Sequence, residues 1–208
     1  MRSLSRSVAG LLFVAVCVPA QELKPIPLPN PQTEGGMPLM QALKQRKSGR
    51  EFSPEKLPPQ VLSNLLWAAW GINRPDGKRT APSAVNWQEI DVYVATADGL
   101  YVYNAKAHQL DPVLKDDVRA ATGTQPFVGQ APLNLVYVAD QAKARRPDEL
   151  WSYAEAGFIA QNVYLYCASE GLTTVVRAMV DRAALAKIMK LRPEQKITLA
   201  QTVGYPKK

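Results

Sequence analysis

The chain has 208 residues, of which 47% are hydrophobic and 21% are charged. This composition is typical of one globular domain and excludes a disordered or repetitive protein. The formal net charge is +7, but most basic residues are dispersed and no nucleic-acid motif accompanies them. We therefore expect solvated surface charge and no nucleic-acid partner.

The first 20 residues resemble a targeting segment rather than part of a folded domain. Arg2 and Arg6 precede a short apolar run over residues 8–18, and small residues end at Ala20. This pattern predicts a secretory signal peptide cleaved near Ala20, and hence an exported, periplasmic protein. The run is shorter than a membrane span, so we expect no integral span after cleavage. An uncleaved interfacial anchor is one alternative, and a lipoprotein modified at Cys17 is another.

Removal of this leader leaves one cysteine, Cys167, beside the one histidine, His108. Neither an intramolecular disulfide nor a conventional His/Cys metal site can be built from them. Cys167 lies in an apolar helical stretch, which favours a buried, inert thiol, and His108 lies in what looks like an exposed loop. This scarcity of acid–base side chains favours chemistry carried by a bound cofactor.

Proline and glycine positions divide the remaining chain. Residues 21–36 form a Pro-rich extended arm, either a flexible tether or a segment that lies across the body of the protein. Residues 37–208 form the domain, with Leu39, Met40 and Leu43 expected to face inward. The apolar periodicity predicts helices over 39–47, 60–70, 111–121, 149–170 and 181–190, and strands over 90–95, 100–103, 133–139, 172–176 and 197–203. This order is α/β or α+β, and the absence of G-x-G-x-x-G after a strand disfavours a dinucleotide fold.

A basic cluster follows the first predicted helix. Arg46, Lys47 and Arg50 surround Ser48 and Gly49 within five residues. Guanidinium groups bind phosphate oxygens or flavin carbonyls through charge-assisted hydrogen bonds, and glycine permits close backbone approach. The alternative is a solvated basic helix end that interacts with the helix dipole.

A second segment, over residues 80–86, offers small polar groups on a loop stiffened by Pro82. Ser83 supplies a hydroxyl, and Asn86 supplies both a donor and an acceptor, as the edge of a flavin ring requires. The alternative is a tight connector with local hydrogen bonds. Taken with the basic cluster, this loop predicts a second wall of a site for a phosphate-bearing aromatic cofactor, which we infer to be FMN.

The ordered set of motifs resembles the nitroreductase family, and within it the branch that includes SagB-type dehydrogenases. The motifs are RxSxR at 46–50, LLWAAWG at 65–71, RTAPSA at 79–84, DGLY at 98–101, EGL at 170–172 and VGYP at 203–206. The resemblance implies an α+β sandwich with a central, mostly antiparallel sheet flanked by helices. It also implies a homodimer that holds FMN at its interface, with hydride chemistry at flavin N5 and a small organic substrate.

The resemblance also implies roles for individual residues by motif position. The FMN phosphate, ribityl chain and pyrimidine edge would be contacted by Arg46, Lys47, Ser48 and Arg50. The partner subunit would contribute Pro82, Ser83 and Asn86, and the flavin face would be lined by Gly171 and Leu172. Relatives continue past the Gly-Tyr-Pro turn to a basic residue that binds the phosphate, so here Lys207 or Lys208 would take its place, or phosphate binding would be weaker.

Helical geometry singles out one further polar residue. Ala154, Phe158, Leu165 and Ala168 share one face of the long predicted helix, and Gln161 falls near the middle of that apolar face. A buried amide without partners is costly, so Gln161 is expected to bond either flavin or substrate, or a neighbouring backbone group, in its own subunit or across a dimer.

The sequence thus predicts an exported FMN oxidoreductase. Because nicotinamide is not freely available outside the membrane, a quinol, a partner protein or an unusual small reductant would be the electron donor. Lys143-Ala144 stands where SagB-type azoline dehydrogenases carry a Lys-Tyr pair, which argues against peptide-heterocycle oxidation. A non-catalytic flavin carrier and a degenerate structural dimer of the same fold are the alternatives.

Overall fold

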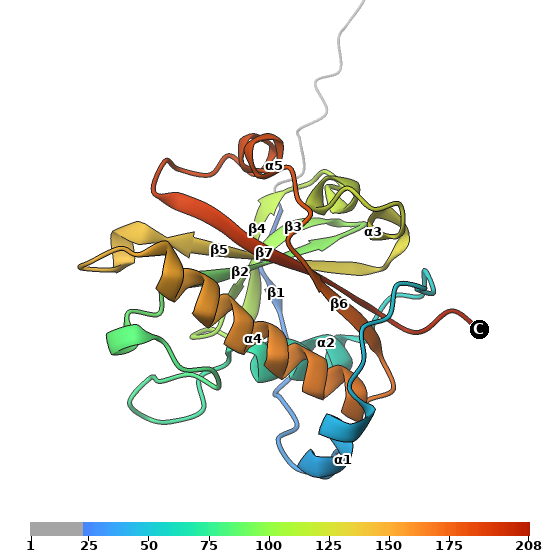
Figure 1. The fold of residues 1–208 in the computed structure, drawn as a ribbon. Coiled ribbons are helices and arrows are strands. Elements are labelled where there is room, and N and C mark those ends of the chain that lie inside the picture. The colour runs from blue at the N-terminus through green and yellow to red at the C-terminus, as the bar shows by residue number, and fades with distance from the viewer. Residues whose placement is uncertain (1–22) are drawn as a thin grey trace, which may run out of the picture.

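The computed structural model describes residues 23–208, so the predicted signal peptide and Cys17 lie outside the described residues. Seven strands form one sheet in the order β1-β4-β3-β2-β5-β7-β6, and every neighbouring pair is antiparallel (Figure 1). The strands are β1 (Ile26–Pro27), β2 (Ile90–Thr96), β3 (Gly99–Asn104), β4 (Gln109–Leu114), β5 (Leu133–Asp140), β6 (Thr173–Arg177) and β7 (Gln195–Gly204). The predicted α+β class with a central antiparallel sheet is confirmed.

Helices pack on both faces of this sheet (Figure 1). The α-helices are α1 (Leu39–Gln45), α2 (Pro59–Trp70), α3 (Phe127–Gln130), α4 (Glu149–Ser169) and α5 (Arg182–Ile188), and the short 3-10 turns are η1 (Ala84–Asn86), η2 (Arg119–Thr122) and η3 (Gln141–Lys143). Successive side chains of β5 point to opposite faces of the sheet. Leu135 packs in the core beneath α2 and α4, and Val136 packs in the core beneath α5. Burial on both faces explains why β5 is a continuous apolar run.

The helix predicted over residues 111–121 is wrong. Most of this segment belongs to β4, which pairs with β3 through Tyr103 and Leu110, and to η2. Pro112, which in the sequence favours a helix start, instead lies in a part of β4 that β1 does not cover. The missing N–H of proline is tolerated at such a strand edge.

The inward orientation predicted for the first helix is also wrong. Ala42 is the buried residue of α1, whereas Leu39, Met40 and Leu43 are exposed. Helix α4 likewise exposes Trp151 and Phe158. Because α1 packs against α4, the chain carries solvent-facing apolar side chains on two adjacent helices.

The Pro-rich arm lies against the body of the protein. The backbone N–H of Leu28 donates to His108 O over 3.1 Å, and the Ser63 hydroxyl donates to Pro29 O over 2.6 Å. His108 is half-buried rather than in an exposed loop: its Nε2 lies 3.0 Å from Pro29 O and its Nδ1 lies 3.0 Å from the Tyr103 hydroxyl. The arm is thus joined to α2 and to the β3–β4 hairpin.

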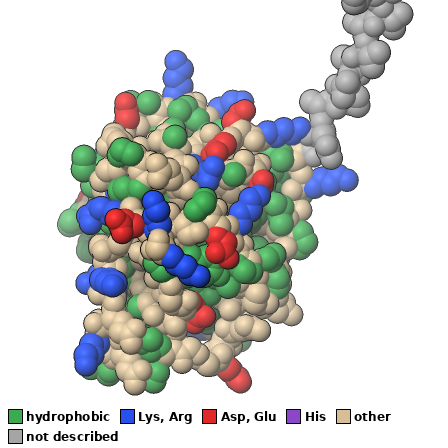
Figure 2. All heavy atoms as spheres, turned by 90° about the vertical axis from the view of Figure 1, so that its right-hand side faces the viewer, with side chains coloured by type: hydrophobic (Ala, Val, Ile, Leu, Met, Phe, Trp, Pro, Cys, Tyr) green, Lys and Arg blue, Asp and Glu red, His purple; other side chains and the backbone are tan. Residues whose placement is uncertain are grey.

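Surface charge is mixed rather than concentrated. On the face drawn in Figure 2, Lys and Arg side chains are interspersed with Asp and Glu, and apolar side chains lie between them. Within residues 23–208, none of the helices has the length and apolar character needed to cross a membrane.

Candidate functional site

The basic cluster forms a loop between α1 and the edge strand β6. Helix α1 ends as the Arg46 N–H donates to Ala42 O over 2.8 Å, and the Gly49 N–H donates to Thr174 O over 3.0 Å. A Cβ atom at Gly49 would collide with the Thr173 hydroxyl. Gly49 therefore permits an approach to β6 that no larger residue allows without displacement.

Tyr164 of α4 holds this loop from the other side. Its hydroxyl lies 2.7 Å from Ser48 Oγ and accepts a hydrogen bond of 3.0 Å from the Val176 backbone N–H. The Arg46 guanidinium carbon lies 5.2 Å from the centre of the Tyr164 ring, within the range of a cation–π contact. The sequence does not single out Tyr164, because an aromatic residue at helical spacing is indistinguishable from a core residue.

A cavity of about 260 Å³ opens beside this loop, at the carboxyl end of α4. Lys47, Tyr164, Gly171 and Leu172 contribute to its lining, together with Gln45, Cys167, Ala168, Thr173, Thr174 and Pro206. Gly171 has a φ of 67°, the left-handed conformation that commonly ends a helix. Cys167 is buried, as predicted, and this burial raises the pKa of its thiol.

The last residues of the chain run beside the same loop. Pro206 pairs with Phe52, and the Lys207 N–H donates to Glu51 O over 3.2 Å. The side chains of Arg46, Lys47, Arg50 and Lys207 form no ion pair within 4.0 Å with any described residue. Four cations without acidic partners thus lie on one loop and the adjoining chain end, an arrangement suited to an anion.

The second predicted wall lies near the other end of α4. There the Ala84 N–H donates to Glu155 Oε1 over 2.6 Å, and Ser83 Oγ accepts from the Gln88 N–H over 3.0 Å. Asn86 Oδ1 accepts from the Gln88 side-chain amide over 2.9 Å. From Glu155 to Cys167 the helix rises about 18 Å, so one chain does not bring Pro82, Ser83 and Asn86 to the cavity.

Comparison with known proteins decides the family. The nitroreductase family model matches residues 43–205. A nitroreductase homologue of Methanocaldococcus jannaschii is 32% identical in an alignment 169 residues long, which covers 74% of this chain and 85% of the relative. The chain belongs to the nitroreductase family. The matched range contains both predicted walls and the strands that position them, and places the protein among FMN-dependent oxidoreductases.

Solved nitroreductase structures share the fold. A homologue from Ralstonia eutropha JMP134 is 47% identical, with a TM-score of 0.85 over 88% of this chain and 90% of its own. A homologue from Desulfovibrio desulfuricans, solved in complex with FMN, is 24% identical, with a TM-score of 0.63 over 84% of this chain and 89% of its own.

The prediction that Gln161 is buried is wrong for the single nitroreductase chain. Gln161 is exposed, and Phe158 on the same face is 47% exposed. The buried face of α4 is instead formed by a different set of positions, among them Ala156, Ile159 and Val163. Helical spacing identifies an apolar face, but a helix with two apolar faces leaves open which of them meets the sheet.

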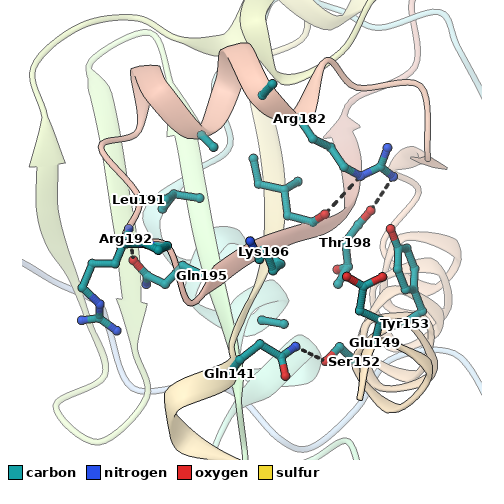
Figure 3. Close-up of a pocket in the computed structure, with 15 residues that line it drawn as sticks. Gln141, Glu149, Ser152, Tyr153, Arg182, Leu191, Arg192, Gln195, Lys196 and Thr198 are labelled. Atoms are coloured by element: carbon teal, nitrogen blue, oxygen red, sulfur yellow. Dashed lines mark hydrogen bonds between the residues drawn. The ribbon is translucent and has the colours of Figure 1, made fainter. Parts of the chain in front are cut away.

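A larger cavity of this protein lies elsewhere, between the start of α4, α5 and the start of β7 (Figure 3). It measures about 480 Å³ and includes none of the predicted site residues in its lining. Arg182 is bound to the backbone there, through Ile197 O over 3.1 Å and Thr198 O over 2.8 Å. The Gln141 amide donates to the Ser152 hydroxyl over 3.0 Å. Size alone therefore does not identify the cofactor site.

Proposed function

We propose that this protein is an exported nitroreductase-family enzyme of the SagB-like branch that acts as a homodimer on a small organic substrate. The observation that carries the proposal is the loop over residues 46–50. Its unpaired cations and the Ser48 hydroxyl adjoin a cavity walled by Gly171 and Leu172. Anion-binding groups beside a small apolar wall suit a cofactor with a phosphate at one end and a planar ring at the other.

The residues present fit FMN. Arg46, Lys47, Arg50 and Lys207 would hold the phosphate and the pyrimidine edge, and Ser48, fixed by Tyr164, would bind the ribityl chain. Gly171 and Leu172 would lie against the ring face, because neither brings a polar side chain to it. Bound FMN supplies hydride transfer at its N5 atom. The Tyr164 hydroxyl, bonded to Ser48 and to the Val176 N–H, would hold the loop that binds the cofactor. Burial keeps the Cys167 thiol neutral, so it would not act as a base.

The homodimer is supported by the apolar surface of α1 and α4. Leu39 is 61% exposed and Met40 76% exposed on α1, and Leu150 is 68% exposed on α4. Val85, at the tip of the loop over residues 82–86, is 82% exposed. Large exposed apolar side chains gathered on adjacent elements are typical of a protein interface. Pairing through it would let one chain deliver Pro82, Ser83 and Asn86 to the cavity of the other.

Export and the electron donor complete the proposal. The leader pattern over residues 1–20 supports secretion to the periplasm, with cleavage near Ala20. In that compartment a quinol or a partner protein is a more available donor than nicotinamide. Fractionation of cells that express the full chain tests export: we expect mature protein that begins at Gln21 in the periplasmic fraction, and full-length cytoplasmic protein would contradict it.

Flavin titration tests the cofactor site. The purified mature protein should bind FMN and quench its fluorescence. Arg46→Ala and Ser48→Ala should weaken this binding, and the matched surface variant Lys187→Ala on α5 should not. No quenching by the unaltered protein, or equal loss in all three variants, would contradict the site.

Turnover separates the enzyme from its alternatives. Bound FMN that is reduced by a quinol analogue and reoxidised by a small acceptor supports the enzyme. Bound FMN that never passes electrons onward indicates a flavin carrier. A dimer that binds no FMN indicates a structural protein.

A further inference from the structure

Two carboxyl groups are buried beneath the loop over residues 82–86. Glu155 lies on the inner face of α4 and is 2% exposed, and Glu89, immediately before β2, is 1% exposed. Burying an ionised carboxylate without a partner costs several kcal/mol or more. Yet within residues 23–208 neither group forms an ion pair.

Charged groups on the neighbouring elements do not neutralise this pair. The Arg79 guanidinium donates to Trp70 O over 2.8 Å and to Gln88 Oε1 over 2.7 Å. On β2, Asp91 is bound to Lys143, and at the end of β5, Asp140 is bound to Arg192. Asp148 and Glu149 lie at the exposed start of α4. None of these charged groups is paired with Glu89 or Glu155.

A backbone hydrogen bond satisfies one oxygen of this pair. Glu155 Oε1 accepts from the Ala84 N–H over 2.6 Å, but Oε2 of Glu155 and Oε2 of Glu89 are buried without a partner among the described residues. The two side chains lie within hydrogen-bonding reach of each other. One proton between them would give one oxygen a donor and the other an acceptor, which satisfies both at once. Burial, helped by Glu89, raises the pKa of Glu155 to about 8.

The loop above the pair has a backbone that needs support. Val85, Asn86 and Gln88 have φ values of 51°, 58° and 52°, in the left-handed region that non-glycine residues seldom adopt. Ser83 and Asn86 are bonded within the loop through Gln88. The Ala84–Glu155 hydrogen bond joins this loop to α4.

We propose that Glu89 and Glu155 share one proton, and that the protonated pair positions the loop over residues 82–86 for flavin binding across the dimer. The second half of this inference rests on the proposed function. Both glutamates are positioning residues, since neither lines the cavity beside the basic loop. Loss of the proton leaves two buried anions in contact, so Glu155 is displaced and the Ala84 N–H loses its acceptor.

The pH dependence of flavin affinity tests the positioning role. In the unaltered protein, the FMN dissociation constant should be flat from pH 6 to about 8 and then rise by up to about tenfold per pH unit, because one proton is lost. Glu155→Gln should bind FMN with a constant that does not change with pH, because its amide donates to Glu89 and its oxygen still accepts from Ala84. Glu155→Ala should bind weakly at every pH.

Glu149→Gln, an exposed position on the same helix, is the matched control and should keep the pH dependence of the unaltered protein. The positioning role is overturned if the unaltered protein binds FMN equally well from pH 6 to pH 9.5. It is also overturned if Glu155→Ala binds as tightly as Glu155→Gln.

A flavin-free measurement keeps this inference separate from the proposed function. The apoprotein at pH 6.5 should show the infrared carbonyl band of a protonated carboxyl, which fades as pH rises through about 8 and is absent in Glu155→Gln. If the band titrates in a protein that binds no FMN, the proposed function fails and the shared proton stands. If FMN binds and no such band exists, the shared proton is refuted.

The pH dependence of unfolding stability gives a further test of the shared proton. A carboxyl whose pKa is higher in the folded than in the unfolded state binds its proton preferentially in the folded state. Its contribution is therefore full below the unfolded pKa of about 4.5 and is lost as pH rises towards the folded value of about 8. Urea unfolding at pH 5.5 and 8.5 should show a smaller difference in stability for Glu155→Gln than for the unaltered protein, and an equal difference would overturn the shared proton.

Discussion

The hydroxyl of Ser48 lies 2.7 Å from the phenol oxygen of Tyr164, a residue 116 positions further along the chain. The same phenol accepts the backbone N–H of Val176 on the edge strand β6. One side chain of α4 thus fixes both the basic loop and the strand beside it. The cations of this loop are presented by a rigid junction of helix, strand and loop rather than by a free helix end.

Replacing Tyr164 by Phe tests this junction. The ring and its contact with Arg46 remain, but Ser48 loses its anchor and the Val176 N–H loses its acceptor. We expect FMN binding to weaken about tenfold and unfolding stability to fall by about 1–2 kcal/mol. Tyr166→Phe is the matched control, since its hydroxyl bonds Val61 O on α2. Equal losses of FMN affinity in both variants would show that the Tyr164 hydroxyl has no special role.

Gly49 lies so close to Thr173 that a substitution at one position can be compensated at the other. Gly49→Ala should displace the basic loop and weaken FMN binding, because the new methyl group meets the Thr173 hydroxyl. Thr173→Ala removes that hydroxyl and leaves room for the methyl group. The double variant should therefore bind FMN like Thr173→Ala alone. A double variant as weak as Gly49→Ala would mean that the methyl group acts in some other way. Fluorescence titration of all three variants measures this.

Much of the fold could be predicted because local sequence and tertiary environment agree. The mainly apolar strand predicted over 133–139 becomes β5, and the long helix α4 stops just before Gly171, whose left-handed φ suits a helix end. The segment after Asn104 could not be predicted from local signals. Asp111-Pro112 favours a helix start, and the pairing of β4 with β3 is a tertiary contact that overrides this preference.

Some of the residues that line the candidate site could be predicted from the sequence, but the residues that hold them in place could not. Lys47 of the cluster at residues 46–50 lines one cavity together with Gly171 and Leu172. Tyr164 carries no sequence signal, because a tyrosine among apolar helix residues looks like a core residue. Glu89 and Glu155 carry none either, because glutamate is ordinarily solvated. Gln161 was wrongly predicted to be buried. Its apolar neighbours on the helix suggest burial, yet this face points outward in the single chain.

The Pro-rich arm should respond to acid through His108. Burial lowers the pKa of His108 below its ordinary value of 6.5. A histidine with a lowered folded pKa stabilises the folded state above its unfolded pKa, and this contribution is lost as pH falls below about 6.5. Amide exchange at Leu28, which donates to His108 O, should lose protection between pH 7 and pH 5.5. In His108→Asn, whose side chain tolerates the φ of 48° at this position, this loss should disappear. Persistence of the loss would assign it to another group.

The apolar face of α4 provides the sharpest test of how the site is completed. Phe158 is 47% exposed and does not line the cavity beside the basic loop. Phe158→Asp should place a charge in the proposed dimer interface and yield a monomer by light scattering. Because the loop over residues 82–86 would then reach no partner, FMN binding should fall at least about tenfold although every cation of residues 46–50 is retained. Met179→Asp, at a residue 60% exposed before α5, is the matched control and should remain dimeric and bind FMN. A monomeric Phe158→Asp protein with unchanged FMN affinity would show that one chain completes the site alone.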